Sequence, residues 1–364
     1  MTKAYLNRVA VAVPEYEVHD TFVRFAGRLL RDRRSRLLFD RMVARSEIQN
    51  RWSCLAPARA GCNESLDGDG FYISGKFPTT AERMSRYEQE APTLAMKALA
   101  RLGLGNTTRD ITHLIVTSCT GLSAPGVDLE LIHRCNLDPS IERTVVGFMG
   151  CNAAINALKL ARHIVRSDPD SRVLIVSVEL CTLHLHESED IERLLSFLLF
   201  GDGCSAALIS AEPFGFALNR FHTEVVPEAA AQITWTIRDF GFDMVLSGQV
   251  PATLAQVLRA GCDRVLDGQP TEAIHMWAVH PGGRTVLDAV QSAFNLNASA
   301  LTTSRAVLRN FGNMSSPTVL FVLEAMMRED IAAGARGCAM AFGPGLTAET
   351  MLFTAAARPA ELAT

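Results

Sequence analysis

The chain has 364 residues, of which 48% are hydrophobic and 20% charged, and is long enough to bury a large core in two domains or one double unit. Its 35 Lys and Arg against 39 Asp and Glu argue against nucleic acid or an anionic membrane as the main partner. No signal-peptide core opens the sequence, and no stretch approaches the roughly 20 apolar residues of a membrane helix. We therefore expect a soluble cytoplasmic protein without stable membrane association.

Helices and strands alternate along the chain in an order that occurs twice. After a basic helical stretch at 24–53, the first copy has a helix at 91–102, a strand at 112–118, a helix at 152–165 and a strand at 172–178. The second copy has the same elements at 251–266, 273–279, 318–327 and 337–342. The strands are near-continuous apolar runs, as expected when helices cover both faces of a sheet. The order predicts a pseudo-duplicated, layered α/β fold with two buried sheets and halves at 1–215 and 216–364.

The nine cysteines of the chain include no C-x-x-C pair, and most lie among apolar residues. This pattern argues against a disulfide framework and against a metal site, and it is typical of reduced thiols in a cytosolic core. Most of these cysteines are therefore expected to be small buried hydrophobes. A catalytic cysteine has to be identified by its setting.

Cys151 has such a setting, because it follows Gly150 and opens the helix at 152–165. A thiol there lies near the positive end of the helix dipole and beside free backbone N–H groups. Gly150 allows the sharp approach from strand to helix that a nucleophile requires. The alternative is that Cys151 is only a small residue that fills the turn.

Two residues of the second copy could assist this thiol. His280 ends the strand at 273–279 and is followed by Pro-Gly-Gly, and ligands bind at the carboxyl ends of parallel strands. Asn313 precedes the helix at 318–327, where it could also be a simple N-cap. A cysteine, a histidine and an asparagine at element ends are typical of covalent acyl chemistry. A cysteine protease would use the same residue types, but the duplicated plan does not fit a papain-like fold.

Five segments in the same order strongly resemble the type III polyketide synthases, relatives of plant chalcone synthase. They are residues 111–128 (ITHLIVTSCTGLSAPGVD), 199–203 (LFGDG), 278–283 (AVHPGG), 312–316 (GNMSS) and 342–350 (FGPGLTAET). The resemblance extends over nearly the whole chain and implies a thiolase fold and a homodimer. It also implies acyl-CoA and malonyl-CoA as substrates, with no further cofactor and no metal.

The resemblance assigns roles to individual residues. Cys151, His280 and Asn313 match the catalytic triad, and Phe200 matches the gatekeeper between the CoA tunnel and the cavity. Around the cavity it implies Phe342, Cys119, Ala124, Glu179, Cys181, His184, Gly241 and Ser315. For CoA binding it implies Arg41 and Arg45 on the phosphates, together with Gly282 and Gly283.

The chain departs from the plant family pattern at several of these positions. Leu38 replaces a third basic residue of the phosphate clamp. Cys119, Cys181 and His184 replace threonines of the cavity, and Ala124 replaces a methionine that reaches into the partner subunit's pocket. Alanine at 124 leaves space open and the two cysteines make the pocket floor less polar, which favours fatty acyl starters and alkylpyrone or alkylresorcinol products. His184 acts in the opposite direction, because it is bulkier than threonine.

In the mechanism that the resemblance implies, Cys151 takes the starter as a thioester and malonyl-CoA loses carbon dioxide. His280 and the Asn313 amide then stabilise the enolate oxygen, and the carbanion attacks the thioester. We also expect His280 to pair with the thiolate and to lower the pKa of Cys151. The starter, the number of extensions and the mode of ring closure are not evident from the sequence.

Three other functions fit the same residues. A malonyl-primed aromatic synthase of the tetrahydroxynaphthalene or phloroglucinol type would differ only in cavity shape. A ketoacyl-acyl-carrier-protein synthase III would have the same fold and triad with a protein carrier. A silent thiolase-fold scaffold subunit would not need the triad that this chain retains.

Overall fold

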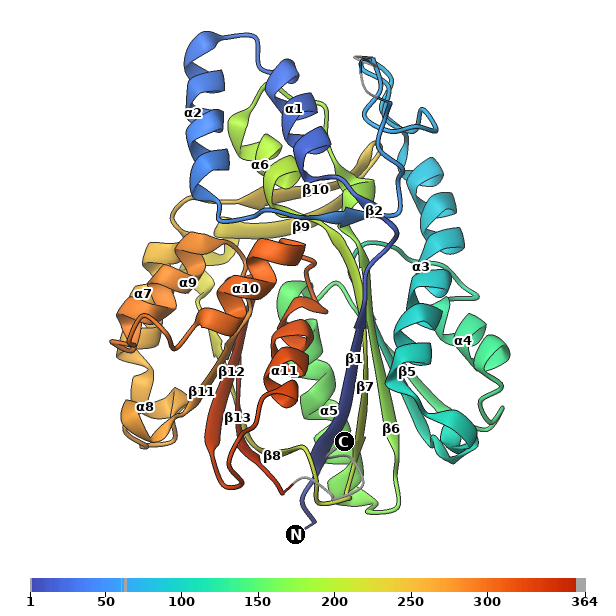
Figure 1. The fold of residues 1–364 in the computed structure, drawn as a ribbon, viewed down its shortest axis with the longest axis vertical. Coiled ribbons are helices and arrows are strands. Elements are labelled where there is room, and N and C mark those ends of the chain that lie inside the picture. The colour runs from blue at the N-terminus through green and yellow to red at the C-terminus, as the bar shows by residue number, and fades with distance from the viewer. Residues whose placement is uncertain (1, 60, 62–63, 358–364) are drawn as a thin grey trace.

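The computed structural model describes residues 2–59, 61 and 64–357. Its centre is one mixed sheet of nine strands (Figure 1). In order across the sheet these are β11 (Met276–Val279), β12 (Arg336–Gly343), β13 (Thr347–Ala355), β8 (Phe216–Val225), β1 (Tyr5–Ala12), β7 (Asp202–Ser210), β6 (Val173–Leu180), β4 (His113–Ser118) and β5 (Glu142–Gly147). Two small antiparallel pairs accompany it, β2 (Tyr16–Glu17) with β3 (Trp52–Ser53), and β9 (Ile233–Arg238) with β10 (Gly241–Leu246).

The sheet has two halves with the same internal order, which confirms the predicted duplication. In the first half β1, β7 and β6 are antiparallel neighbours and β4 is parallel to β6. In the second half β8, β13 and β12 are antiparallel neighbours and β11 is parallel to β12. The sequence analysis expected two separate sheets, but the two halves belong to one continuous sheet. They join through β1 and β8, where Tyr5 pairs with Ala217 and Leu6 with Phe216.

In the described part of the chain, eleven helices cover and separate the two halves of the sheet. In chain order they are α1 (His19–Leu29), α2 (Arg33–Arg45), α3 (Thr80–Leu102), α4 (Val127–Cys135), α5 (Ala153–Ser167), α6 (Ile191–Leu199), α7 (Val250–Ala260), α8 (Cys262–Val265), α9 (Arg284–Ala293), α10 (Thr302–Phe311) and α11 (Thr318–Arg328). Among the residues that the structure describes, five 3-10 turns lie between them, η1 (Gly105–Asp110), η2 (Gly150–Asn152), η3 (Cys181–His184), η4 (Pro227–Gln232) and η5 (Thr271–Ala273).

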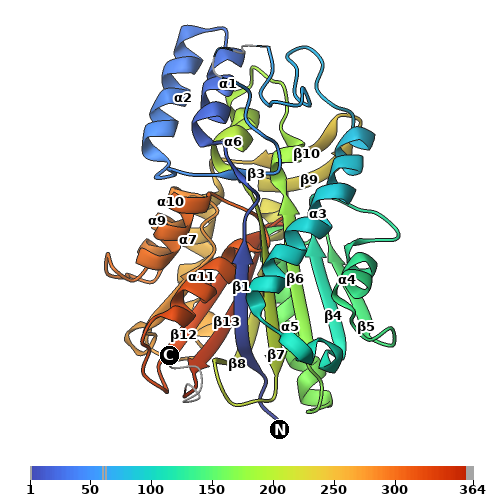
Figure 2. The ribbon, with the colours of Figure 1, turned by 45° about the vertical axis from the view of Figure 1, so that its right-hand side comes forward.

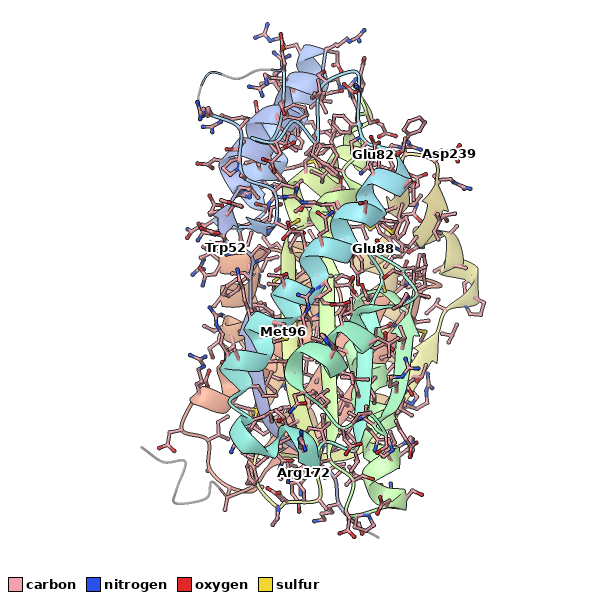
Figure 3. The ribbon with its side chains drawn as sticks, turned by 90° about the vertical axis from the view of Figure 1, so that its right-hand side faces the viewer. Trp52, Glu82, Glu88, Met96, Arg172 and Asp239 are labelled. Carbon is pink, nitrogen blue, oxygen red and sulfur yellow. The ribbon has the colours of Figure 1, made fainter. Side chains whose placement is uncertain are left out.

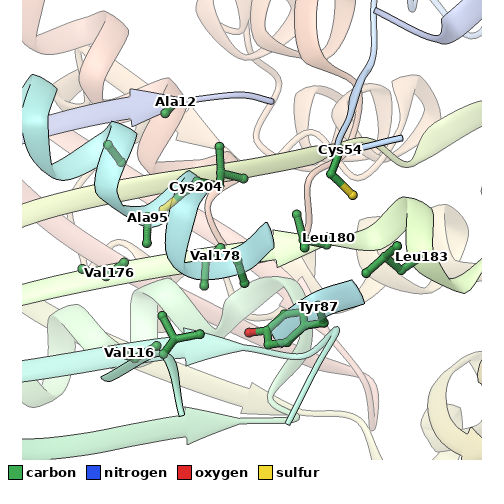
Figure 4. Close-up of a cluster of buried hydrophobic side chains, with 14 of the residues drawn as sticks. Ala12, Cys54, Tyr87, Ala95, Val116, Val176, Val178, Leu180, Leu183 and Cys204 are labelled. Carbon is green, nitrogen blue, oxygen red and sulfur yellow. The ribbon is translucent and has the colours of Figure 1, made fainter. Parts of the chain in front are cut away.

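Successive residues of a strand point to opposite faces of the sheet, and their side chains form three apolar clusters. Each cluster lies between a layer of helices and the sheet, so the two halves of the sheet and the helices form five layers. Val176 and Val178 of β6 face an outer cluster with α3, which Figure 4 shows in close-up, whereas Ile175 faces a central cluster. The central cluster contains α5 and α11 and takes residues from both halves. A third cluster covers the opposite face of the second half with α7 and α9. The αβαβα layering predicted from the sequence is therefore present.

The helix α3 shows how local sequence sets an outer layer. Thr79 caps it by accepting from the Glu82 N–H while the Glu82 carboxylate accepts from the Thr79 N–H, and Gly103 ends it at a φ of 68°. Figure 3 shows the helix running along the sheet, with Glu82 near Asp239 at one end. There the Thr80 N–H donates to the Asp239 carbonyl at 2.8 Å, which ties the helix to the β9–β10 hairpin.

Within the described part of the chain, no helix is long and apolar enough to cross a membrane. The helices α1, α2 and α6 gather at one end of the molecule, beside the β9–β10 hairpin (Figures 1 and 2). The ends of several central strands point toward this group, so the loops that follow them lie beneath it.

Candidate active site

Cys151 lies at the start of the central helix α5, in the turn η2 after β5. Gly150 before it has a φ of 78°, and a Cβ there would lie 2.3 Å from Cδ of Pro344. Only glycine therefore lets this turn pack against the loop after β12, in the other half of the chain. The helix α5 directs the positive end of its dipole toward Cys151, as the sequence analysis expected.

His280 follows β11, and its imidazole is buried, with 1% of the residue exposed. Its backbone N–H donates to the Met340 carbonyl at 2.8 Å, which extends the pairing of β11 with β12. Among the described residues, neither ring nitrogen has a hydrogen-bond partner. Burying an imidazole without hydrogen-bond partners costs free energy, so a group that enters the site and hydrogen-bonds to this ring would recover part of that cost.

Asn313 is fixed through its backbone to the segment before β7. Its N–H donates to the Leu199 carbonyl at 2.9 Å, and its own carbonyl accepts from the Gly201 N–H at 3.0 Å. Its Oδ1 accepts from the Ser315 N–H at 2.8 Å, while Nδ2 donates to the Gly282 carbonyl at 3.3 Å. Asn313 is not the N-cap of α11, which is Pro317. The amide is therefore oriented by the loop, with its donor toward the His280 loop.

Burial disfavours the charged forms of both Cys151 and His280. It raises the pKa of Cys151 to about 11, although hydrogen bonds from Ser315 and Asn313 act in the opposite direction. It lowers the pKa of His280 to about 3. Removal from water opposes both charges, so burial disfavours the expected ion pair of thiolate and imidazolium, which remains a prediction. The thiol proton must move when an acyl group is loaded.

Glu179 lies behind the site as a buried connector between the two halves. Its carboxylate accepts from the Cys119 N–H at 2.9 Å, from the Thr120 hydroxyl at 2.8 Å and from the Ser316 hydroxyl at 2.6 Å. Burial raises the pKa of Glu179 to about 7 despite these bonds. The residue holds the loop after β4 against the loop that carries Asn313.

One cavity joins these residues, with about 1110 Å³ of empty space including the part open to solvent. Cys151, His280 and Asn313 all line it, so residues far apart in the chain meet at one place. Seven further residues singled out from the sequence also line it, namely Cys119, Cys181, His184, Phe200, Gly282, Ser315 and Phe342. Most of the remaining wall is apolar, with Leu195, Ile233, Met244, Leu246, Val250 and Leu254.

Family models match nearly the whole chain. The N-terminal domain of chalcone and stilbene synthases matches residues 8–213, and the C-terminal domain matches residues 217–357. The chain belongs to the type III polyketide synthases. These are acyltransferase-type condensing enzymes, as predicted from the sequence motifs.

Individual relatives support this assignment. The chain is 34% identical to the alpha-pyrone synthesis polyketide synthase-like Pks18 of Mycobacterium tuberculosis, over 76% of this chain and 73% of that protein. It is 33% identical to bisdemethoxycurcumin synthase of Oryza sativa subsp. japonica, over 80% and 76%.

Solved structures show the same fold. PKS-I of the brown alga Ectocarpus siliculosus superposes with a TM-score of 0.87 at 28% identity, over 98% of this chain and 99% of that one. The 1,3,6,8-tetrahydroxynaphthalene synthase of Streptomyces coelicolor A3(2) gives 0.85 at 26% identity, over 97% and 100%. The thiolase fold expected from the sequence is thereby confirmed.

Several of the expected site residues lie outside the wall of this polyketide synthase cavity. Glu179 is behind the wall, and Ala124 is exposed in the loop after β4. Gly241 begins β10 with a φ of 105°, and a Cβ there would lie 2.9 Å from the Arg83 guanidinium carbon. Its glycine is thus explained by backbone conformation and packing. Gly241 is not among the residues that line the cavity, and its role at the cavity remains a prediction.

The residues expected to bind CoA fall into two groups. Gly282 lines the cavity, and Gly283 packs beside it, where a Cβ would lie 3.9 Å from Cδ2 of Leu199. Arg41 and Arg45 lie on the exposed face of α2 and are not part of the wall. The sequence-based clamp on the CoA phosphates remains a prediction.

The sequence analysis missed Trp235, which closes one side of the cavity from β9. Its Nε1–H donates to the Cys119 carbonyl at 2.7 Å. The alternating pattern of 233–238 (ITWTIR) would have indicated a strand. The sequence did not indicate where its tryptophan points.

His184 holds the same β9–β10 hairpin from a second side. Its Nδ1 accepts from the Phe242 N–H at 3.0 Å, so Nε2 carries the proton and donates to the Thr120 carbonyl at 2.6 Å. The imidazole stacks on the Phe242 ring at 4.1 Å between centroids, and burial lowers the pKa of His184 to about 3. His184 is therefore a neutral, fixed part of the wall.

Proposed function

We propose that this enzyme loads a fatty acyl starter from CoA onto Cys151 and extends it with malonyl-CoA to an alkylpyrone or alkylresorcinol. The observation that carries the proposal is the junction of Cys151, His280 and Asn313 at one largely apolar cavity. A cavity of this polarity favours an alkyl chain, since each buried methylene contributes about 0.8 kcal/mol. Similarity to an alpha-pyrone synthesis protein also supports it.

The three polar groups divide the chemistry between them. The Cys151 sulfur attacks the starter thioester carbonyl, and the unpartnered His280 imidazole is the group available to take the thiol proton. In the condensation step His280 and the Asn313 Nδ2 donate to the oxygen of the malonyl-derived enolate. Asn313 cannot lose this donor by titration, and the Ser315 N–H holds its orientation. The reaction needs CoA thioesters and no further cofactor.

Phe200 and Arg41 with Arg45 have supporting roles in this proposal. Phe200 stands where the segment before β7 meets Asn313, and its ring lines the cavity next to the catalytic residues. It can separate the pantetheine tunnel from the cavity that receives the growing chain. Arg41 and Arg45 are exposed cations on α2, near the helix α6 that forms part of the wall. They can hold the CoA phosphates.

We further propose a homodimer that covers an exposed apolar patch around the edge strand β5. The patch consists of Leu122, Leu129, Val145 and Met149, each at least 39% exposed. An open edge strand with apolar neighbours is a hazard unless another chain covers it. Ala124 lies in the loop that adjoins this patch, so a partner's cavity would lie within its reach.

A malonyl-primed aromatic synthase is the second candidate, because the bulky side chains of Trp235 and His184 line the cavity and reduce the space for a long acyl chain. Similarity to the tetrahydroxynaphthalene synthase supports it as well. The test is mass spectrometry of products from malonyl-CoA with C2 to C18 acyl-CoA starters and with malonyl-CoA alone. Alkylpyrones or alkylresorcinols from C8 and longer starters are expected. A product from malonyl-CoA alone, with no use of long starters, would select the aromatic synthase.

A further inference from the structure

The helices α1 and α2 carry a basic surface that the proposed chemistry uses only in part. Between positions 24 and 45 the chain has eight arginines and two aspartates, although its net charge is -4. The helix α2 begins after Asp32, whose carboxylate accepts from the N–H groups of Arg34 and Ser35 at 2.9 Å. This cap begins α2 at the end where Arg33, Arg34 and Arg36 lie.

Some of these arginines have partners within the chain, and others do not. Arg31 pairs with Glu189 at 2.9 Å, and Arg36 donates to the Leu30 carbonyl at 2.7 Å. In the part of the chain that the structure describes, no side-chain hydrogen bond or ion pair is formed by Arg33, Arg34, Arg41 or Arg45. All four are exposed. We call these four arginines, with Leu37 and Leu38, the α2 surface.

Two leucines lie among these free cations. Leu37 and Leu38 are 53% and 48% exposed, whereas Phe39 is fully buried. With 3.6 residues per turn, Arg34, Leu38, Arg41 and Arg45 follow one another along the same outer stripe of the helix. Exposed apolar side chains beside arginines are typical of protein interfaces, where both kinds of side chain make contacts. A ligand that presents only phosphate groups would gain no binding energy from the leucines.

The α2 surface is also longer than a CoA clamp needs, and it lies near the cavity. From Arg33 to Arg45 the helix rises about 18 Å at 1.5 Å per residue. The CoA phosphates would occupy the end with Arg41 and Arg45, which leaves Arg33 and Arg34 beyond them. The helix packs on α6, which contributes to the cavity wall, and both lie at the same end of the molecule (Figures 1 and 2).

We propose that the α2 surface docks an acidic carrier protein that delivers the starter as a phosphopantetheine thioester. The inference rests on the proposed function, because it supplies the starter to the same thiol. CoA and such a carrier present the same acyl-phosphopantetheine arm, and only the head group outside the tunnel differs. The Cys151 sulfur bonds to the acyl carbon, and the carrier's pantetheine sulfur leaves with the thiol proton. Opposite charges on carrier and enzyme speed the encounter.

The test compares two forms of one starter with wild-type enzyme and an Arg33→Glu/Arg34→Glu variant. Dodecanoyl groups are presented either on CoA or on a purified bacterial acyl carrier protein, with malonyl-CoA held constant. For the carrier-bound starter, kcat/KM should fall at least about tenfold in the variant and also with rising salt. For dodecanoyl-CoA it should stay within about twofold, since Arg33 and Arg34 lie outside the phosphate clamp. Glutamates in the first turn of α2 also suit its dipole, so the variant should fold.

The matched control is Arg109→Glu/Arg259→Glu, which reverses two exposed arginines on η1 and α7. It should leave both starters unaffected. Wild-type enzyme that uses dodecanoyl-CoA but not the carrier-bound form would overturn the docking proposal alone. Failure with both starters would overturn the proposed function instead. Loss of binding to phosphatidylglycerol vesicles in the Arg33→Glu/Arg34→Glu variant, with unchanged carrier kinetics, would assign the surface to a membrane and reject the carrier.

Discussion

The Arg51 guanidinium donates from Nη1 to the carbonyl oxygen of Phe200 at 2.8 Å, deep inside the protein. Its Nε donates to Nδ1 of His19 at 2.9 Å, and Arg51 itself is fully buried. Phe200 in turn bridges to Asn313 through the backbone. Arg51 is therefore a positioning residue that fixes the segment on which the Asn313 amide depends.

Replacing Arg51 by methionine should reduce the rate of malonyl-CoA decarboxylation about a hundredfold. The Asn313 amide would lose its support, and displacing a catalytic donor by about 1 Å lowers the rate by about that factor. Alkylation of Cys151 by iodoacetamide should change much less, since Arg51 does not support the turn η2. Arg51→Lys is the comparison variant, because it keeps the charge and one donor and should recover part of the rate. Equal losses of alkylation and decarboxylation in a folded Arg51→Met protein would contradict the positioning role.

The raised pKa of Cys151 predicts how its reactivity changes with pH. Below a pKa of about 11 the thiolate fraction grows tenfold per pH unit, so iodoacetamide should label Cys151 about a hundred times faster at pH 9 than at pH 7. Peptide mass spectrometry at each pH gives the rate, with the fully buried Cys204 as an internal control that stays unlabelled. A rate that is already constant from pH 6 upward would show a preformed thiolate–imidazolium pair.

Replacing Cys151 separates loading from decarboxylation. Cys151→Ala and Cys151→Ser should abolish polyketide formation, because neither provides a thiolate for the starter. Cys151→Gln should still release acetyl-CoA from malonyl-CoA, since His280 and Asn313 remain and the amide resembles an acylated thiol. Chromatography of the CoA products measures both reactions. A glutamine variant without acetyl-CoA release would argue against His280 and Asn313 as an independent decarboxylation unit.

The sequence was sufficient for the parts of this site that depend on repeated local patterns. Apolar runs predict β4, β6, β11 and β12, and the end of β11 leads to His280. Asn313 is recognisable because it precedes the predicted helix at 318–327. Cys151 is recognisable because a glycine and a helix start adjoin it. These features depend on residues that are close together in the chain, so they can be predicted from the local sequence.

The rest of the site depends on contacts between distant segments. Arg51 belongs to a stretch whose composition indicates an exposed basic helix, yet its side chain is fully buried and bonds to Phe200. The pairing of Trp235 with the Cys119 carbonyl spans 116 positions. The pKa of Cys151 follows from removal of the thiol from water, which no motif reports. Such properties arise only when the two halves have packed together.

Subunit association can be tested at the apolar patch around β5. Val145→Glu places a charge in the centre of the patch and should convert a dimer into a monomer in sedimentation experiments at micromolar concentration. Val225→Glu is the matched control, because Val225 is 53% exposed on β8 and Val145 is 54% exposed. The control should sediment as the wild type does. A wild-type protein that is monomeric at this concentration would refute the homodimer.

Ala124 provides the test of starter selection, because its side chain lies in the exposed loop next to the dimer patch. In the proposed dimer a larger side chain there would project into the partner's cavity and shorten the space for an alkyl chain. Ala124→Met and Ala124→Trp should therefore lower kcat/KM for C12 and longer acyl-CoA starters. Short starters, which do not reach that depth, should be spared. Each methylene that no longer fits forfeits about 0.8 kcal/mol, so displacing two should cost roughly tenfold.

The control for this series is Ala231→Met, which enlarges an exposed alanine in η4 away from the patch. It should leave the chain-length profile unchanged. The profile is measured by competition among C4 to C16 acyl-CoA starters with mass spectrometry of the products, so that one experiment ranks all lengths under the same conditions. Equal losses at every length would mean that Ala124 affects folding or association and not the pocket. Absence of long-chain products from the parent enzyme would remove the fatty acyl assignment and favour a malonyl-primed reaction.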